Sequence, residues 1–447
     1  MKLPYLLLAL ALAASPAQAA KKHAHAAAHQ AQPAADATPA QSAPAPAASN
    51  PNLPTPQAVP RPSAAPAGPG PTPPPPQIDA KSWVLMDYAS GQILLGGNED
   101  ARVAPASITK VMTSYVVSAE LKHGKIHLED KVQISEKAWR SGGAGTDGST
   151  SFLQLNSEVS LKDLLYGMII QSGNDAAIAL AEHTAGSEET FAQLMNQYAQ
   201  QLGMKGTHYM DASGLPNPEH YTTARDIALM SRALIRDYPD EYKIYAIKDF
   251  EWNGIMQHNR NTLLWRDPSV DGIKTGHTAA AGYCLAASAK QGDSRMIAIV
   301  MGASSEKARA DSAMALLNYG FRFYETHKLY DASKPLATPR LWKGATNQLP
   351  LGVADNVLVT VKRGQYDQLK ATMDIPATLI APFKKGQQVG TLRITLAGQP
   401  VQSVPLIAMN DAPQGGFFSR LWDSIMLWFH GDKKAAAEAP AKSTDAK

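Results

Sequence analysis

A serine and a lysine stand three residues apart at the start of an apolar-periodic segment. Ser107 and Lys110 belong to the run Ser-Ile-Thr-Lys, which follows Pro105 and Ala106. Residues three apart share one face of a helix, so the hydroxyl and the amine would be within reach of each other. Serine is a poor nucleophile at neutral pH, but a lysine whose pKa is lowered by burial can accept its proton. The pair is a candidate for nucleophilic catalysis; the alternative is a capping serine and a surface lysine.

A second group with chemical potential is Ser172-Gly173-Asn174, between the apolar segment 161–170 and a helical pattern over 175–185. A hydroxyl and an amide at a tight glycine turn can relay a proton to a leaving group and hold a substrate carbonyl. The alternative is an ordinary turn between two helices with a capping residue.

A third group is Lys274-Thr275-Gly276-His277-Thr278, which precedes a strand pattern ending at residue 289. Glycine would let a substrate backbone lie against the strand edge, the hydroxyl would donate a hydrogen bond, and lysine would supply positive charge for an anion. The alternative is a polar turn beside a strand.

Each motif is common by chance, but S-x-x-K, S-x-N and K-T-G in this order form a specific pattern. The sequence resembles the low-molecular-mass penicillin-binding proteins, serine-type D-alanyl-D-alanine carboxypeptidases (peptidase S11-like) that trim peptidoglycan stem peptides. The likeness extends from about residue 78 to 430. It rests on the runs that begin at Pro105, Gln171 and Val270, together with a trailing β domain and a C-terminal amphipathic segment.

The resemblance implies a role for each matching residue. Ser107 would form the acyl-enzyme, Lys110 would be its general base, and Ser172 would transfer protons. Substrate binding would fall to Asn174, Lys274, Thr275, Gly276, His277, Arg260 and Arg309. The backbone N–H groups of Ser107 and His277 would form the oxyanion hole. Stem peptides and β-lactam antibiotics are the expected partners, with no cofactor and no metal.

Three other functions remain open. A class A β-lactamase usually has Ser-Asp-Asn where this chain has Ser-Gly-Asn, needs a glutamate for rapid deacylation, and lacks a β domain and an anchor. A D,D-endopeptidase would use the same chemistry on crosslinked peptides. A non-catalytic scaffold that binds the cell wall is the third possibility, although the complete Ser/Lys/Ser set argues against it.

The elements that must position these motifs alternate between strand and helix patterns. An opening hairpin is expected at 83–87 and 93–96, helices at 107–123, 161–185, 188–202, 224–237 and 304–325, and strands at 282–289 and 295–302. Strands at both ends of a helical segment predict an α+β domain over 78–329 with one antiparallel sheet. This agrees with the penicillin-binding/β-lactamase-like transpeptidase fold that the resemblance implies.

The pattern changes after residue 329. Runs with period two at 357–361, 369–373 and 391–396, separated by Gly, Pro and Asp, predict a small all-β domain over 330–412. This domain offers no constellation of acid, histidine and serine that could do chemistry.

The N-terminal segment predicts export. A charged start, a short apolar run and small residues before Ala20 are typical of a signal peptide over 1–19. Residues 20–77 are rich in Ala and Pro and have no Phe, Trp or Tyr, so they cannot bury a core and read as a disordered spacer. His23, His25 and His29 in this spacer could bind a metal only loosely, and a solvated tract is the preferred interpretation.

The C-terminal segment predicts membrane attachment. On a helical wheel, five aromatic side chains between Phe417 and Phe429 share a stripe with Leu421 and Ile425. The segment 413–432 is too short and too charged to span a bilayer but suits a helix lying in its interface, before a disordered tail over 433–447. Docking of this helix on the protein's own core is the alternative. The expected location is the periplasm, on the outer face of the inner membrane.

Charge and cysteine content exclude several classes of protein. The formal net charge of +3 is too small to argue for a nucleic-acid partner. The single cysteine, Cys284, excludes an intrachain disulfide framework and any site with several cysteine ligands. We expect it to be a small buried apolar residue.

Overall fold

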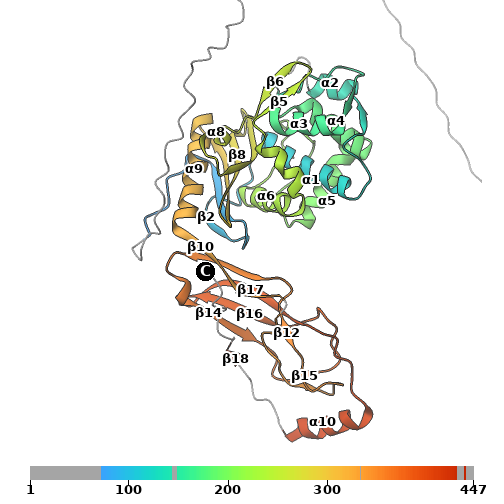
Figure 1. Cartoon of the computed structure of the whole chain (residues 1–447), viewed down its shortest axis with the longest axis vertical. Helices are drawn as coiled ribbons and strands as arrows, with labels where there is room; N and C mark the ends of the chain where they lie inside the picture. The colour runs from blue at the N-terminus through green and yellow to red at the C-terminus, as the bar shows by residue number, and fades with distance from the viewer. Residues whose placement is uncertain (1–71, 143–147, 333, 430–436, 439–447) are drawn as a thin grey trace, which may run out of the picture. The chain divides into compact units, whose positions relative to one another are not determined.

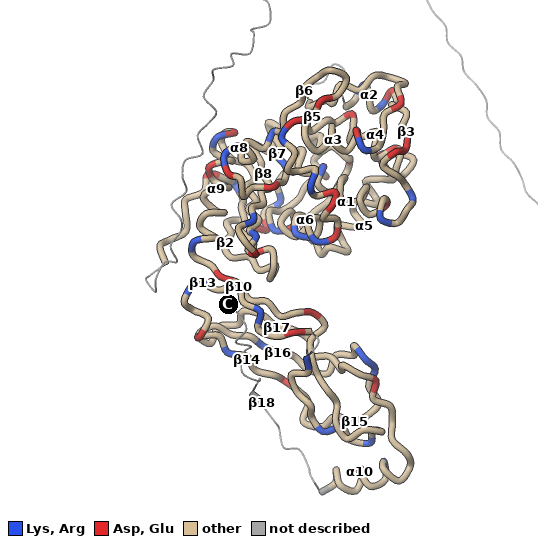
Figure 2. The backbone as a smooth tube through the Cα atoms, in the orientation of Figure 1, with Lys and Arg blue, Asp and Glu red and all other residues tan. Residues whose placement is uncertain are grey.

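The computed structural model describes residues 72–142, 148–332, 334–429 and 437–438 (Figure 1). The expected signal peptide, most of the spacer and nearly all of the tail lie outside these ranges. Lys, Arg, Asp and Glu are interspersed along the described chain, as Figure 2 shows, in keeping with the small net charge.

A five-stranded antiparallel sheet organises the first domain. Its strand order is β2-β1-β9-β8-β7. The strands are β1 (Ser82–Asp87), β2 (Ile93–Gly97), β7 (Val270–Thr278), β8 (Gly282–Gln291) and β9 (Ser294–Ala303). Side chains alternate between two cores, because Val84 and Met86 point to one face of the sheet and Leu85 to the other. The prediction that strands from both ends of the segment share one antiparallel sheet is confirmed.

Helices cover both faces of this sheet. They are α1 (Thr109–Lys122), α2 (Glu136–Gly142), α3 (Leu161–Tyr166), α4 (Asn174–Ala185), α5 (Glu188–Gln201), α6 (Ala224–Asp237), α7 (Pro239–Tyr242), α8 (Leu263–Arg266) and α9 (Glu306–Phe323). Short helical turns are η1 (Ala106–Ile108), η2 (Gly167–Gln171) and η3 (Lys243–Ala246). Two small antiparallel sheets have two strands each: β3 (Lys131–Gln133) with β4 (Glu158–Ser160), and the hairpin of β5 (Asp249–Trp252) with β6 (Ile255–His258). α9 ends at Phe323, slightly before the expected position.

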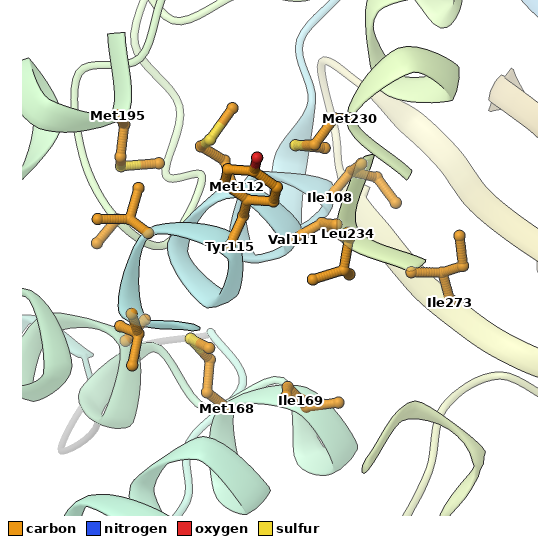
Figure 3. Packing of buried hydrophobic residues seen from close by; sticks show 14 of the residues in the cluster. Ile108, Val111, Met112, Tyr115, Met168, Ile169, Met195, Met230, Leu234 and Ile273 are labelled. Carbon is orange, nitrogen blue, oxygen red and sulfur yellow. The ribbon is translucent and has the colours of Figure 1, made fainter. Parts of the chain in front are cut away.

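α1 is the central helix of the larger core. Its side chains are buried from Thr109 to Glu120, so apolar neighbours surround it instead of covering one stripe. Figure 3 shows side chains from several elements converging on it, among them Met168, Met230 and Ile273. Burial on all sides fixes the position of the residues at the helix start.

The K-T-G motif lies within β7 and not in a turn before the strand. Polar Lys274 and Thr275 are buried there, so hydropathy gave no strand signal over 270–278. β7 pairs with β8 on one side only and is an edge strand of the sheet.

The second domain is all-β, as predicted. The expected strands form as β13 (Val357–Lys362), β14 (Leu369–Asp374) and β16 (Gln388–Leu396), around a core that includes Val359, Leu392 and Leu406. The sequence did not indicate β10 (Tyr324–Tyr330), β11 (Leu341–Trp342), β12 (Leu351–Gly352), β15 (Leu379–Ile380), β17 (Gln399–Ala408), β18 (Ala437–Glu438) and the turn η4 (Tyr366–Gln368). β10 pairs with β13, and the larger sheet has the order β12-β17-β16-β14-β18.

The last helix, α10 (Phe417–Phe429), contacts the second domain through Asp423. The Asp423 carboxylate accepts a hydrogen bond of 2.5 Å from the Lys343 N–H and lies 3.6 Å from the Arg340 guanidinium. The aromatic stripe is exposed, with Phe418 at 83% and Trp428 at 81%. Within the described ranges, no helix combines the length and apolar character needed to cross a membrane.

Candidate active site

Ser107 and Lys110 meet at the start of α1. Lys110 Nζ donates a hydrogen bond of 3.0 Å to Ser107 Oγ, as the three-residue spacing predicts. Ser107 lies in η1, directly after Ala106, whose φ of +50° is in the left-handed region. Such a conformation in a non-glycine residue is strained and persists only where the surroundings fix it.

The Lys110 side chain is fully buried and has two further oxygen partners. Its Nζ donates to Asn174 Oδ1 at 2.6 Å and to the Ser213 carbonyl at 2.7 Å. Burial lowers the pKa of Lys110 to about 7, although the carboxylates of Asp211 and Asp175 partly oppose that shift. A substantial fraction of this amine is therefore neutral near pH 7 and able to accept a proton.

The Ser172-Gly173-Asn174 turn connects η2, a π-helical turn, to α4. Ser172 ends η2 with a φ of +72°, which sharply turns the chain. Gly173 has no space for a side chain, because a Cβ there would lie 2.0 Å from Ser151 Oγ. The Asn174 N–H donates to the Ser149 carbonyl, so this turn is also fastened to the opposite chain segment.

A carboxylate holds that segment in place. Asp175 accepts hydrogen bonds from the N–H groups of Ser151 and Leu153 and from the Thr150 hydroxyl, at 2.8 to 3.1 Å. The sequence gave no signal for this role, since an aspartate in the first turn of a helix is common.

β7 lies directly beside the turn that carries Ser107. A Cβ at Gly276 would be 3.1 Å from the Pro105 carbonyl and 3.2 Å from the Ile108 nitrogen, so glycine permits the close approach of the two elements. Lys274 is buried, and burial together with the nearby charges of Lys110, Arg260 and Arg309 lowers its pKa well below the usual value. The His277 ring is exposed and lies 4.1 Å from the Tyr283 ring.

Arg260 and Arg309, the two arginines predicted from sequence, also lie beside β7 and Ser107. Arg309, on α9, donates to the Gly276 carbonyl at 3.4 Å and pairs with Glu306 at 2.7 Å. Burial lowers the pKa of both Arg260 and Arg309, but each remains a cation at neutral pH. These two guanidinium groups concentrate positive charge next to Lys274.

One cavity of about 980 Å³ brings these groups together. Its lining includes Ser107, Ser172, Asn174, Arg260, Thr275, Gly276, His277 and Arg309. Lys110 and Lys274 do not line it but lie buried beneath Ser107 and within β7. The sequence missed other contributors to the wall, among them Ser213, Tyr283 and Glu306, whose residue types are common on any surface.

A serine joined to a buried lysine beside the free edge of an antiparallel sheet defines a serine acyl-transfer enzyme of the penicillin-binding class. The chain belongs to the D-alanyl-D-alanine carboxypeptidase family, peptidase S11, whose model matches residues 70–305. Residues 324–414 match the C-terminal domain of penicillin-binding protein 5. The chain is therefore a serine-type D-alanyl-D-alanine carboxypeptidase, as the motifs predict.

Relatives agree in both sequence and structure. The chain is 48% identical to the D-alanyl-D-alanine carboxypeptidase DacC of Escherichia coli K12 over 79% of this chain and 89% of that protein. The crystal structure of penicillin-binding protein 5 from Haemophilus influenzae superimposes with a TM-score of 0.73 at 45% identity, covering 76% of this chain and 99% of that one. DacD from Francisella tularensis gives 0.63 at 36% identity, covering 77% and 97%. The predicted fold and enzyme class are confirmed.

Proposed function

We propose that Ser107 is the nucleophile and Lys110 the general base of an acyl-enzyme mechanism on stem peptides ending in D-Ala-D-Ala. Ser107 Oγ bonds to the carbonyl carbon of the penultimate D-alanine while its proton passes to Lys110 Nζ. The peptide C–N bond then breaks, and the leaving amine receives a proton through the Ser172 hydroxyl. Water hydrolyses the ester in the second half-reaction. The observation that carries this proposal is the buried Lys110 Nζ at 3.0 Å from Ser107 Oγ.

The cationic end of the cavity suits the terminal carboxylate of the substrate. Arg260 and Arg309 supply positive charge there, and Thr275 and His277 add hydrogen-bond donors. Burial lowers the pKa of Lys274, but a bound carboxylate would favour its protonated form and so a charge-assisted hydrogen bond. The substrate backbone would pair with the free edge of β7, and Asn174 would hold the peptide on the opposite side. The N–H groups of Ser107 and His277 would stabilise the developing oxyanion. Because the cationic groups would bind the terminal carboxylate, the enzyme would require a substrate with a free C-terminus.

The direct test is release of D-alanine from a diacetylated tripeptide that ends in D-Ala-D-Ala. The wild-type protein should release D-alanine, and Ser107→Ala should not. A crosslinked peptide dimer assayed in parallel measures D,D-endopeptidase activity. Absence of D-alanine release by folded wild-type protein would contradict the proposal, and faster cleavage of the dimer would favour the endopeptidase.

Penicillin should acylate the same serine, since a β-lactam presents a reactive amide and a carboxylate to the same groups. Covalent penicillin binding is typical of this family. We therefore expect β-lactam antibiotics as covalent ligands and a role in cell-wall remodelling and cell shape for the carboxypeptidase activity.

We further propose that the protein is exported to the periplasm and attached to the outer face of the inner membrane. Export rests on the signal-peptide pattern of residues 1–19. Attachment rests on α10, where Phe417, Phe418, Trp422 and Trp428 are exposed while Asp423 is bonded to the second domain. A helix with its polar face docked on protein and its aromatic face exposed suits the headgroup boundary of a bilayer.

A further inference from the structure

The segment from Asp211 to His220 is fastened to α1 by a chain of polar contacts that are buried or partly buried. The Asp211 carboxylate lies 3.2 Å from His220 Nδ1, and His220 Nε2 lies 2.9 Å from the Thr109 hydroxyl on α1. The side chains of Thr109 and His220 are almost completely buried, so water does not compete for these contacts. The chain therefore joins the base of the segment to the turn that carries Lys110.

The other oxygen of Asp211 shapes the turn above it. Asp211 Oδ1 accepts hydrogen bonds from the N–H groups of Ser213 and Gly214, at 2.7 and 2.6 Å, and from the Ser213 hydroxyl at 3.0 Å. These bonds orient the peptide plane after Ser213, whose carbonyl accepts the 2.7 Å hydrogen bond from Lys110 Nζ. A single carboxylate thus determines where one of the three oxygen partners of Lys110 lies.

The same turn also presses on the backbone that precedes the nucleophile. A Cβ at Gly214, which has a φ of +88°, would lie 1.9 Å from the Ala106 carbonyl oxygen. Ala106 is the strained residue next to Ser107. Contact with Gly214 is therefore part of what holds Ala106, and hence Ser107, in place.

We propose that Asp211 and His220 are positioning residues for acylation, which act on Lys110 through the Ser213 carbonyl and on Ser107 through Gly214 and Ala106. This inference rests on the proposed role of Lys110 as the base. Asp211 touches neither Ser107 nor Lys110 through its side chain, so it is not itself a catalytic residue.

The negative charge of Asp211 also raises the pKa of Lys110, an effect that a merely structural residue would not have. Three carboxylates near Lys110 raise its pKa: Asp211, Asp175 and Glu188. The Arg260 cation lowers the pKa of Lys110. Lys274 is also near, since the Lys110 charge lowers the pKa of Lys274. Hydrogen bonds from His220, Ser213 and Gly214 overcome the effect of burial and keep the pKa of Asp211 low, at about 2. Asp211 is therefore an anion throughout the working range. Its removal should lower the pKa of Lys110.

The experiment measures second-order acylation by a fluorescent penicillin as a function of pH. For Asp211→Asn we expect the maximal rate to fall about tenfold or more, because the oriented hydrogen bonds weaken. The midpoint of the acidic limb should move to lower pH, since Lys110 loses a neighbouring anion. Thr109→Val, which removes the contact to His220 without changing a charge, should lower the maximal rate and leave the midpoint in place, and Thr109→Ser should restore the rate.

The matched control is Asp226→Asn. Asp226 is buried and, like Asp211, holds a turn: it accepts hydrogen bonds from the Gly206 N–H and the Thr207 hydroxyl, neither of which belongs to the Lys110 site. This variant should lose thermal stability while its maximal rate and midpoint stay at wild-type values. If Asp211→Asn and Thr109→Val acylate with wild-type rates and midpoints, or if Asp211→Asn only loses stability as the control does, the inference is wrong. Failure of the wild-type protein to acylate would instead overturn the proposed role of Ser107 and Lys110.

Discussion

Lys110 Nζ and Ser107 Oγ are 3.0 Å apart, in a site where the amine has no exposed surface. Three oxygens surround this nitrogen: the hydroxyl it would deprotonate, the Asn174 amide oxygen and the Ser213 carbonyl. Burial destabilises the charged form of the amine, and the neutral oxygens and more distant carboxylates offset only part of that free energy. The same contacts therefore supply both the geometry and the proton affinity that a base needs near neutral pH.

Acylation should rise with pH through a midpoint near 7. As the proposed base, Lys110 would react as the neutral amine, and its pKa is lowered to about 7, so the rate should fall as the pH drops below that value. Stopped-flow acylation between pH 5.5 and 8.5 measures the limb. Lys110→Ala should lower the rate by roughly 10²–10⁴, whereas Lys125→Ala on the surface should not change it. A rate independent of pH in wild-type protein would contradict the role of Lys110.

Gly173→Ala should disturb the Ser172-Asn174 turn. The φ of this residue, −55°, is compatible with alanine, so the penalty comes from the methyl group, which would lie 2.0 Å from Ser151 Oγ and 2.7 Å from Asp175 Oδ1. We expect a loss of about 1–3 kcal/mol in unfolding free energy, typical of overpacking, and slower acylation. Ser151→Gly in the same chain should restore part of the stability in a denaturant titration. Full stability of the single variant would show that the turn has more space than its packing indicates.

The proximity of Ser107 and Lys110 could be predicted from the sequence, because residues three apart lie on one face of a helix. No other part of the chain is needed to bring Ser107 and Lys110 together. The apolar periodicity over 107–123 predicts the helix from sequence. The position of Lys274 was harder to predict, since β7 buries polar residues at a sheet edge and period-two hydropathy does not mark such a strand. The residues beside Lys274 could be identified only from the pairing of β7 with β8 in the folded sheet.

Lys274→Ala should weaken substrates that carry a free carboxylate. A charge-assisted hydrogen bond to a carboxylate contributes roughly 1.5–3 kcal/mol, so kcat/KM for the peptide should fall by about tenfold to 150-fold. Amidation of the peptide C-terminus should slow the wild-type enzyme strongly and the variant far less. The control is Lys248→Ala, because Lys248 is exposed and is not on the strand that carries the K-T-G motif. If amidation slows wild type and variant equally, Lys274 does not bind the terminal carboxylate of the substrate.

Membrane binding should depend on the exposed aromatic face of α10. Full burial of one such side chain contributes roughly 1.5–3 kcal/mol, and partial burial in the interface still favours binding. Truncation before Gly415, or the pair Phe418→Ser and Trp428→Ser, should reduce sedimentation with vesicles that contain anionic lipid. Activity on the small tripeptide should be unchanged, because the cavity lining ends at Arg309. Equal and poor sedimentation of full-length and truncated protein would contradict attachment through this helix.

The residues around Asp211 could not be found from sequence for a different physical reason. Asp211, His220 and Thr109 lie on separate segments, and the effect on Lys110 passes through the Ser213 backbone carbonyl, which every residue type possesses. Similarly, the docking of Asp423 on Lys343 depends on a backbone N–H. Local patterns indicate side-chain types and periodicity, but contacts made through the main chain emerge only in the folded protein.

The acyl-enzyme itself tests the central claim most directly. Folded wild-type protein, incubated with benzylpenicillin and examined by intact mass spectrometry with peptide mapping, should gain one penicilloyl group, located on Ser107. Ser107→Ala should gain none and keep the wild-type melting profile. A label on another serine, or labelling of the Ser107→Ala variant, would contradict Ser107 as the nucleophile.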